Sequence, residues 1–127
     1  MKGPLSILLV GRIRRAEFHE AVAALRKYGR VSAACDAAEA EQFLAEGLHP
    51  ADLIVVAQSF PGEFTTYAVD RLRRRAPLAR VVGLLGSWCE GEVRSGDPWP
   101  ATIRVYWHQW LDRCAAELDR LQADRLA

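Results

Sequence analysis

The sequence has little net charge, few cysteines and no long hydrophobic run, and each shortage excludes a class of protein. Seventeen basic residues against 16 acidic ones leave a formal charge of +1, too small to attract a nucleic-acid backbone or a membrane surface. The three cysteines are widely spaced, without a Cys-x-x-Cys pair, so neither a disulfide framework nor a zinc site is expected. The apolar run Ile7–Val10 is too short for a signal peptide or a membrane span. We therefore expect a reduced, cytoplasmic protein that binds neither nucleic acid nor membrane.

The remaining composition is that of a folded domain. The chain has 127 residues, of which 50% are hydrophobic and 26% are charged. This is enough apolar side chain for one well-buried core, and too little chain for two domains of ordinary size. We predict a single domain over residues 1–127.

Short apolar segments alternate with segments of helical period along the chain. The strands predicted from the apolar segments are Ile7–Val10, Arg30–Ala34, Asp52–Ala57, Val81–Leu85 and Thr102–Trp107. The predicted helices are Ala16–Tyr28, a short helix after the N-cap Asp36, Phe64–Arg75 and Trp110–Leu126. This alternation predicts an α/β fold with a doubly wound sheet of five parallel strands and helices on both faces. Such sheets bind ligands at the carboxyl ends of their strands, so the residues after each strand are the first candidates for a site.

The segment Gly86–Ala101 interrupts the alternation. It holds three glycines and two prolines and has no sustained helical period. Loops of this length in compact domains are usually functional or mobile. We predict an ordered loop in place of the helix between strands four and five, held against the sheet by Trp88 and Trp99 near its two ends.

The stretch from Asp52 to Gly62, DLIVVAQSFPG, resembles the third strand and following loop of bacterial response-regulator receiver domains. The Pro61-Gly62 step falls where that family has its own Pro-Gly step, and the length and element order are similar over nearly the whole chain. The resemblance implies a receiver-like, flavodoxin-like sheet with strand order 2-1-3-4-5. It also implies a role in intracellular signalling or regulation.

The positions that carry phosphoryl chemistry in the receiver family hold other residue types in this chain. The family has an acidic pair after strand one, a phosphate-accepting aspartate ending strand three, a hydroxyl residue ending strand four and a lysine-proline pair after strand five. Magnesium needs several oxygen ligands, normally carboxylates, and an alanine is no nucleophile. We predict a degenerate pseudo-receiver that is not an enzyme and has no metal site or cofactor. The four positions hold Gly11 and Arg12, then Ala57, then Leu85 or Gly86 with Ser87 close by, and finally His108-Gln109.

Polar and reactive side chains are predicted to gather around a crevice at this edge of the sheet. Arginine beside a helix start attracts anions, which leaves a small-molecule or anion sensor as the alternative function. Cys89 and His108 also leave open a small thiol or metal enzyme, although their spacing is not a metal signature. We expect Cys89 to be the most reactive thiol and Cys114, on the last helix, to be buried. The crevice candidates are Arg12, Gln58, Ser87, Trp88, Cys89, Glu90 and His108.

All four tryptophans lie between residues 88 and 110. Tryptophan and tyrosine dominate interface anchors, so this region is predicted to be an interaction surface. The alternative is that some of these side chains fill the core in place of the missing helix. We predict a protein–protein interaction module of unknown partner, with a possible homodimer through strand five and the last helix. The candidates for the surface are Trp99, Tyr106, Trp107 and Trp110.

An arginine cluster, Arg71 and Arg73–Arg75, ends the third predicted helix. Helix geometry spreads these side chains over more than one face, whereas nucleic-acid binding needs a continuous basic stripe and a larger positive excess. The C-terminus of a helix favours cations through the helix dipole. We interpret the cluster as a solvated helix end.

Overall fold

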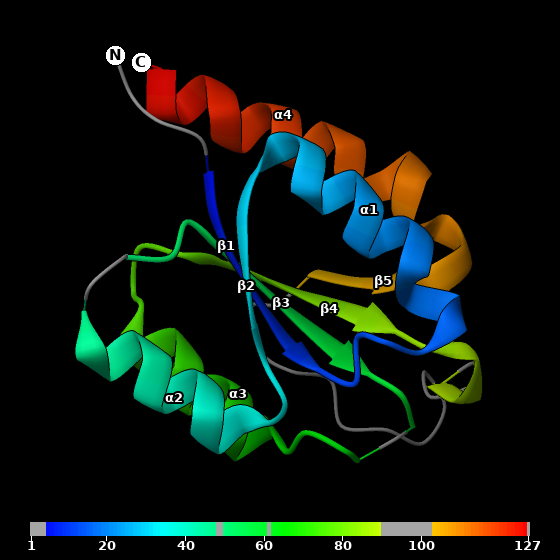
Figure 1. The fold of residues 1–127 in the computed structure, drawn as a ribbon, viewed down its shortest axis with the longest axis horizontal. Helices are drawn as coiled ribbons and strands as arrows, with labels where there is room; N and C mark the ends of the chain where they lie inside the picture. Colours follow the sequence, from blue (N-terminus) through cyan, green and yellow to red (C-terminus); the bar gives the residue numbers. More distant parts are fainter. Residues whose placement is uncertain (1–4, 48–49, 61, 90–102, 127) are drawn as a thin grey trace.

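The computed structural model describes residues 5–47, 50–60, 62–89 and 103–126. Five parallel strands form one sheet in the order β2-β1-β3-β4-β5 (Figure 1). This confirms the predicted strand order and α/β class. The strands are β1 (Leu5–Gly11), β2 (Gly29–Ala34), β3 (Leu53–Gln58), β4 (Arg80–Leu85) and β5 (Ile103–Tyr106). The helices are η1 (Ala16–Phe18), α1 (His19–Tyr28), α2 (Ala37–Glu46), α3 (Thr66–Arg75), η2 (Ser87–Cys89), η4 (Trp107–Gln109) and α4 (Trp110–Leu126), the η helices being of the 3-10 type.

The helices cover both faces of the sheet. In Figure 1, α1 and α4 lie on one side of the strands, and α2 and α3 lie on the other. Because adjacent residues of a strand point to opposite faces, Leu9 and Val55 join the core under α1 and α4, whereas Leu8 and Ile54 join the core under α2 and α3. Every residue of β3 is buried. Burial of the strands on both faces therefore explains why the sequence has uninterrupted apolar runs at these positions.

The ends of α2 and α3 are capped by their own side chains. Oδ1 of Asp36 accepts a hydrogen bond from the backbone N–H of Glu39 at 2.8 Å, as the capping pattern predicts. Gly47 ends the same helix in the left-handed conformation, with φ of 66°. Oγ1 of Thr65 accepts from the N–H of Ala68 at 3.0 Å and so begins α3. Local chemistry thus determines where these two helices begin.

β1 and β3 approach each other closely at their carboxyl ends. Gly11 pairs with Ala57 and has φ of +117°, in a region that side chains rarely adopt. A Cβ atom at position 11 would lie 2.4 Å from the carbonyl oxygen of Ala57 and 3.3 Å from Cζ of Phe64. Only glycine fits here, and the Phe64 ring occupies the space beside it.

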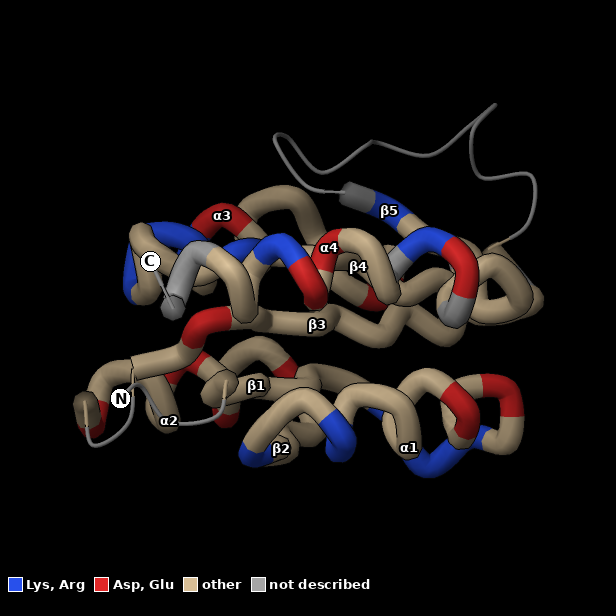
Figure 2. The backbone as a smooth tube through the Cα atoms, turned by 90° about the horizontal axis from the view of Figure 1, so that it is seen from above, with Lys and Arg blue, Asp and Glu red and all other residues tan. Residues whose placement is uncertain are grey.

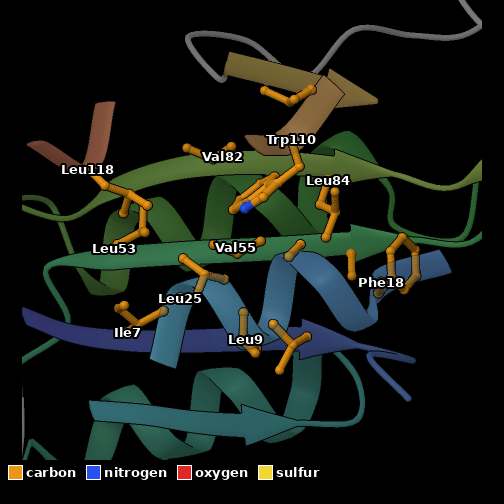
Figure 3. Packing of buried hydrophobic residues seen from close by; sticks show 14 of the residues in the cluster. Ile7, Leu9, Phe18, Leu25, Leu53, Val55, Val82, Leu84, Trp110 and Leu118 are labelled. Carbon is orange, nitrogen blue, oxygen red and sulfur yellow. The ribbon is translucent and has the colours of Figure 1, made fainter. Parts of the chain in front are cut away.

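Trp110 belongs to the core, so its assignment to an interaction surface was wrong. Its side chain is 2% exposed. It packs with Leu25 of α1 and with Val82 and Leu84 of β4 in one cluster (Figure 3). The first residue of α4 faces the sheet, and an indole there fills the space between helix and sheet. Core filling was the alternative that the sequence left open, and it holds for Trp110.

The predicted loop over Gly86–Ala101 is described only at its start. Ser87–Cys89 form the short helix η2, in which the N–H of Cys89 bonds to the carbonyl of Gly86 at 3.0 Å. The rest of that prediction, an ordered loop in place of a helix, falls on residues 90–102, outside the described residues. None of the helices in the described ranges is long and apolar enough to cross a membrane.

Candidate functional site

The carboxyl ends of β1, β3 and β4 meet at one edge of the sheet, which we name the carboxyl edge. The strand register places Gly11 beside Ala57, and Ala57 beside Leu84. Ala57 is fully buried, and its methyl group offers no atom that can accept a phosphoryl group or bind a cation. The strands therefore present no carboxylate of their own at this edge.

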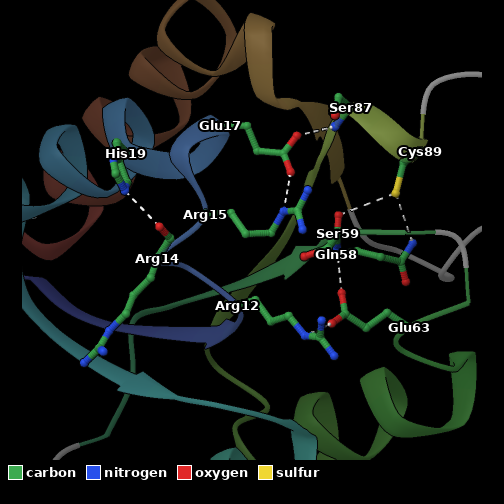
Figure 4. Close-up of polar contacts among 10 residues, drawn as sticks. All are labelled: Arg12, Arg14, Arg15, Glu17, His19, Gln58, Ser59, Glu63, Ser87 and Cys89. Carbon is green, nitrogen blue, oxygen red and sulfur yellow. Dashed lines mark hydrogen bonds and ion pairs between the residues drawn. The ribbon is translucent and has the colours of Figure 1, made fainter.

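One carboxylate reaches the carboxyl edge from the loop after β3. Oε1 of Glu63 accepts a hydrogen bond from the backbone N–H of Ser59 at 2.6 Å, and Oε2 lies 3.4 Å from Nε of Arg12 (Figure 4). The Glu63 side chain is only 12% exposed. The Arg12 guanidinium also lies over the Phe60 ring, 5.8 Å from its centroid. These contacts join the residue after β1 to the loop after β3.

A second carboxylate, that of Glu17, joins η1 to η2. Its Oε2 accepts a hydrogen bond from the backbone N–H of Ser87 at 2.6 Å, and its Oε1 accepts from Nε of Arg15 at 2.7 Å. Burial alone would raise the pKa of Glu17, but the hydrogen bonds from Ser87 and Arg15 outweigh burial and lower its pKa below the ordinary 4.5. The carboxylate is thus held in its charged form between the segments that follow β1 and β4.

Gln58 and Cys89 form a buried pair beneath these contacts. Gln58 is 1% exposed and Cys89 is fully buried. The Cys89 thiol donates to the Gln58 carbonyl, with Sγ 3.5 Å from the oxygen, and the Gln58 amide nitrogen lies 3.9 Å from the same Sγ. The amide oxygen of Gln58 accepts from the N–H of Phe64 at 3.1 Å. Both side chains therefore tie the loops after β3 and β4 together from inside.

Cys89 is buried, which contradicts the exposure on which its predicted reactivity depended. A sequence position after a strand indicated an exposed loop, but η2 turns the Cys89 side chain into the protein, where it bonds to Gln58. Of the two cysteines whose side chains the structure describes, Cys35, directly after β2, is the exposed one. The side chain of Cys114 lies outside the described residues, and so does its predicted burial.

The aromatic residues of β5 and η4 lie beside the core of α4. Tyr106 and Trp107 are partly buried, and His108 is exposed. The rings of Tyr106 and His108 are parallel, with centroids 6.1 Å apart, and Trp107 meets His108 edge-on at 5.6 Å. Nε1 of Trp107 is buried without a hydrogen-bond partner in the described structure. Among the predicted surface residues, Tyr106 and Trp107 thus have accessible parts.

Three of the predicted site residues are not located by the structure. Glu90 and Trp99 lie outside the described residues, and of Trp88 only the backbone, in η2, is described. Four of the predicted crevice residues do lie together at the carboxyl ends of β1, β3 and β4 (Figure 4). They are the side chains of Arg12, Gln58 and Cys89 and the backbone N–H of Ser87.

Sequence reasoning missed the two acidic residues of this edge, Glu17 and Glu63. Both lie five or more residues beyond the end of β1 or β3, whereas we took the residues directly after each strand as the first candidates. The sequence does contain a pattern that could have indicated these two residues. Arg12, Arg15 and Glu17 follow β1, and Glu63 follows β3. Opposite charges at neighbouring strand ends are expected to pair.

The described residues contain no group of three His, Cys, Asp or Glu side chains that could hold a metal ion. At the carboxyl edge, the oxygens of Glu17 and Glu63 already accept bonds from backbone N–H groups and arginines. A magnesium ion there would have to displace two cationic guanidinium groups. The side chains that the structure describes at this edge do not fit a magnesium site.

Comparison with known proteins gives a likeness of fold. No protein-family model matches the chain, and no curated protein matches its sequence. A response regulator receiver protein from Sinorhizobium medicae WSM419 matches with a TM-score of 0.62 and 18% identity, over 93% of this chain and 97% of that one. A two component transcriptional regulator AraC from Clostridium phytofermentans ISDg matches with a TM-score of 0.64 and 16% identity, over 97% and 98% of the two chains. This chain therefore has the flavodoxin-like fold of response-regulator receiver proteins.

Proposed function

We propose that this protein is a pseudo-receiver, which acts without phosphorylation as a protein–protein interaction module in cytoplasmic signalling or regulation. The likeness of fold to receiver proteins supports the general class. One observation carries the rest of the proposal. The two carboxylates of the carboxyl edge, Glu17 and Glu63, are each bound by a backbone N–H and an arginine of the same chain.

These contacts make phosphoryl transfer at the carboxyl edge unfavourable. An acceptor carboxylate is absent at Ala57, and a cation would meet Arg12 and Arg15 before it met an open carboxylate. The same contacts fix the relative positions of η1, η2 and the loop after β3. We infer that this edge has one conformation, set by the sequence and independent of a phosphate group.

The interaction surface of this proposal lies along β5 and η4. β5 is an edge strand of the described sheet, and edge strands are common sites of pairing between chains. Tyr106, Trp107 and His108 follow one another there, and partly exposed aromatic side chains are common anchors at interfaces. An enzyme built on Cys89 has less support, because its thiol is buried and donates to a backbone carbonyl.

The alternative of an anion or small-molecule sensor also has less support. Arg12, its main cationic residue, is paired with Glu63 and stacked over Phe60. Gln58 and Cys89, two further candidates, are buried and bonded to each other. These side chains are engaged within the protein, so a ligand would have to compete with contacts that are already made.

Incubation with acetyl phosphate and Mg²⁺ tests the absence of phosphoryl transfer. We expect the intact mass of the protein to stay free of a phosphoryl adduct, because position 57 has no nucleophile. An adduct that maps by peptide sequencing to an aspartate or glutamate at the carboxyl edge would contradict the proposal.

Affinity capture with matched variants tests the interaction surface. We expect a partner that the wild type retains to be lost with Tyr106→Ala and kept with Tyr67→Ala. Tyr67 is a suitable control because it is 68% exposed on α3, on the opposite face of the sheet from α4. Capture that requires prior treatment with acetyl phosphate would contradict the proposed independence from phosphorylation.

A further inference from the structure

The strand β2 forms the edge of the sheet opposite β5. It pairs with β1 on one side, in an unbroken register from Leu5 opposite Gly29 to Val10 opposite Ala34. No other described strand pairs with it, and no turn, loop or side chain among the described residues forms a hydrogen bond with Arg30–Ala34. A strand directs its N–H and C=O groups alternately to its two sides, so every second residue of β2 directs these groups away from β1. β2 therefore offers backbone donors and acceptors to a further strand.

The sequence of β2 lacks the features that usually protect an edge strand. Proteins protect such strands with proline, lysine, a β-bulge or charged side chains that point inward. The strand reads GRVSAA, without proline or lysine, its register with β1 has no bulge, and its one charged residue, Arg30, is exposed. The other side chains are small or β-branched, and Val31, Ser32 and Ala33 are at least partly exposed. Such a strand is suited to pairing with an extended segment.

The two faces of β2 differ in character. Val31 lies opposite Ile7 of β1 and packs against the core under α1 and α4. Arg30, one residue earlier, points to the other face of the sheet, on the side of α2 and α3. The side chains of a strand added to β2 would continue these two faces. Apolar side chains would then lie beside Val31, and a charged side chain would lie beside Arg30.

Arg30 has no acidic partner within the described part of the chain. Its side chain forms no ion pair or hydrogen bond there, and neither do the exposed side chains of Arg26 and Lys27, in the last turn of α1. The described acidic side chains of α1 and α2, the helices that pack on β2, are thus not bound to these three cations. The helix dipole favours Arg26 and Lys27 at the end of α1, but Arg30 lies outside the helix. A negative charge from another molecule can therefore pair with Arg30.

The exposed backbone and the cations lie on one side of the molecule. Figure 2 shows β2 and α1 on this side and β5 on the opposite side, with Lys and Arg positions coloured in both β2 and α1. We name this surface the β2 edge and define it as Arg26, Lys27 and Arg30–Ala34. A free inorganic anion could pair with its cations but could not use the donors and acceptors of an extended strand. An acidic peptide in the extended conformation can use both.

We propose that the β2 edge binds an extended acidic segment of a partner protein, which joins the sheet as a further strand. The segment forms backbone hydrogen bonds with β2, one of its carboxylates pairs with Arg30, and apolar side chains lie beside Val31 and Ala33. Backbone pairing supplies affinity in such a complex, and the alternate side chains supply specificity. The β2 edge is separate from the carboxyl edge and from β5, so the proposal goes beyond the function proposed above and does not depend on it.

Fluorescence anisotropy of a labelled peptide of alternating glutamate and valine, titrated with the full chain, tests the added strand. Two further peptides carry N-methyl groups, one on every glutamate nitrogen and the other on every valine nitrogen. Because a strand directs alternate N–H groups to its two sides, only one of these sets of nitrogens faces β2. We expect one methylated peptide to bind about tenfold more weakly or worse, and the other to bind within about threefold of the parent peptide.

The variant Arg30→Glu tests the charge contact. We expect it to bind the glutamate–valine peptide about tenfold more weakly, because like charges then lie opposite each other. We also expect it to bind a lysine–valine peptide more tightly than the wild type does. Arg113→Glu is the matched control, since Arg113 is likewise exposed and lies on α4. It changes the net charge by the same amount and should leave binding of the glutamate–valine peptide within about twofold.

Amide NMR of the wild type during the same titration locates the contact, and we expect shifts at Arg30–Ala34. Four outcomes would overturn the proposal. Equal binding of the two methylated peptides would exclude an added strand, and equal effects of Arg30→Glu and Arg113→Glu would indicate unspecific attraction to net charge. Shifts confined to Ile103–Tyr106 would place the peptide at the other edge of the sheet. Displacement of the peptide by inorganic phosphate at equal concentration would indicate a simple anion site.

Discussion

Among the single residues of the carboxyl edge, the two glutamates Glu17 and Glu63 determine its chemistry. Glu17 and Glu63 lie outside the strands, yet each side chain is at most 12% exposed. Each accepts a backbone N–H and faces an arginine, so neither carboxylate is buried without compensation. A group that could have bound a cation is used instead to hold two loops.

Glu17→Gln is expected to lower the free energy of unfolding by about 1 kcal/mol at neutral pH. Glutamine keeps an acceptor for the N–H of Ser87 but loses the charge that strengthens this bond and the pair with Arg15. Because the folded-state pKa of Glu17 lies below the ordinary 4.5, its stabilisation is fully present above that value. It is lost as the pH falls through the folded-state pKa.

Urea unfolding of both proteins between neutral pH and acid measures this difference. The two free energies should converge as the pH falls below the ordinary carboxyl pKa. Glu20→Gln removes an exposed carboxylate from α1 and serves as the control, with an expected change within about 0.5 kcal/mol. A constant difference between wild type and Glu17→Gln over the whole range would contradict the assignment.

Ser59→Ala is expected to stabilise the protein. Ser59 is 2% exposed, and its Oγ is buried without a hydrogen-bond partner in the described structure. A buried polar group without a partner costs about 1–3 kcal/mol, whereas its backbone N–H keeps the bond to Glu63 in the variant. Thermal unfolding should show a higher midpoint for Ser59→Ala, and a lower midpoint would mean that the hydroxyl makes a stabilising contact.

At the scale of elements, the close approach of β1 to β3 depends on Gly11. Gly11→Ala is expected to cost about 2–5 kcal/mol, because the new Cβ would overlap the carbonyl of Ala57 in addition to adopting a strained φ. Gly47→Ala is the matched control, since Gly47 also has a positive φ but has open space around it. Its expected cost is about 1 kcal/mol. Chemical denaturation that gives equal costs for the two variants would contradict the role of close approach.

Most of the elements could be predicted from the sequence, and the side-chain contacts of the site could not. The five strands and the N-cap at Asp36 follow from local patterns of a few residues, and the strand order follows from the resemblance to receiver domains. The bond between Glu17 and Ser87 joins residues 70 positions apart, and no local pattern indicates it. Likewise, the sequence pointed to the aromatic residues near β5 without showing that Trp110 turns inward. Burial of these side chains depends on packing between elements, which a local pattern does not contain.

At the scale of the whole molecule, we predict a homodimer through β5 and α4. β5 is an edge strand of the described sheet, and Tyr106 contributes a partly exposed ring there. Sedimentation velocity at micromolar concentration should show a dimer for the wild type and a shift to monomer for Tyr106→Glu. Tyr67→Glu, on α3, is the control and should stay dimeric. A wild type that stays monomeric at high concentration would refute the dimer.

We propose that contacts within the chain, and no cation or phosphoryl group, hold the carboxyl edge in place. Amide NMR during titration with Mg²⁺ and beryllofluoride, an analogue of a phosphoryl group, tests it most directly. The resonances to follow are the N–H groups of Ser59 and Ser87, which bond to Glu63 and Glu17. Glu17→Gln, measured alone, shows how far the Ser87 resonance moves when its partner changes. We expect no saturable shift at either amide in the wild type. Saturable shifts at Ser59 and Ser87 on addition of Mg²⁺ and beryllofluoride would contradict it.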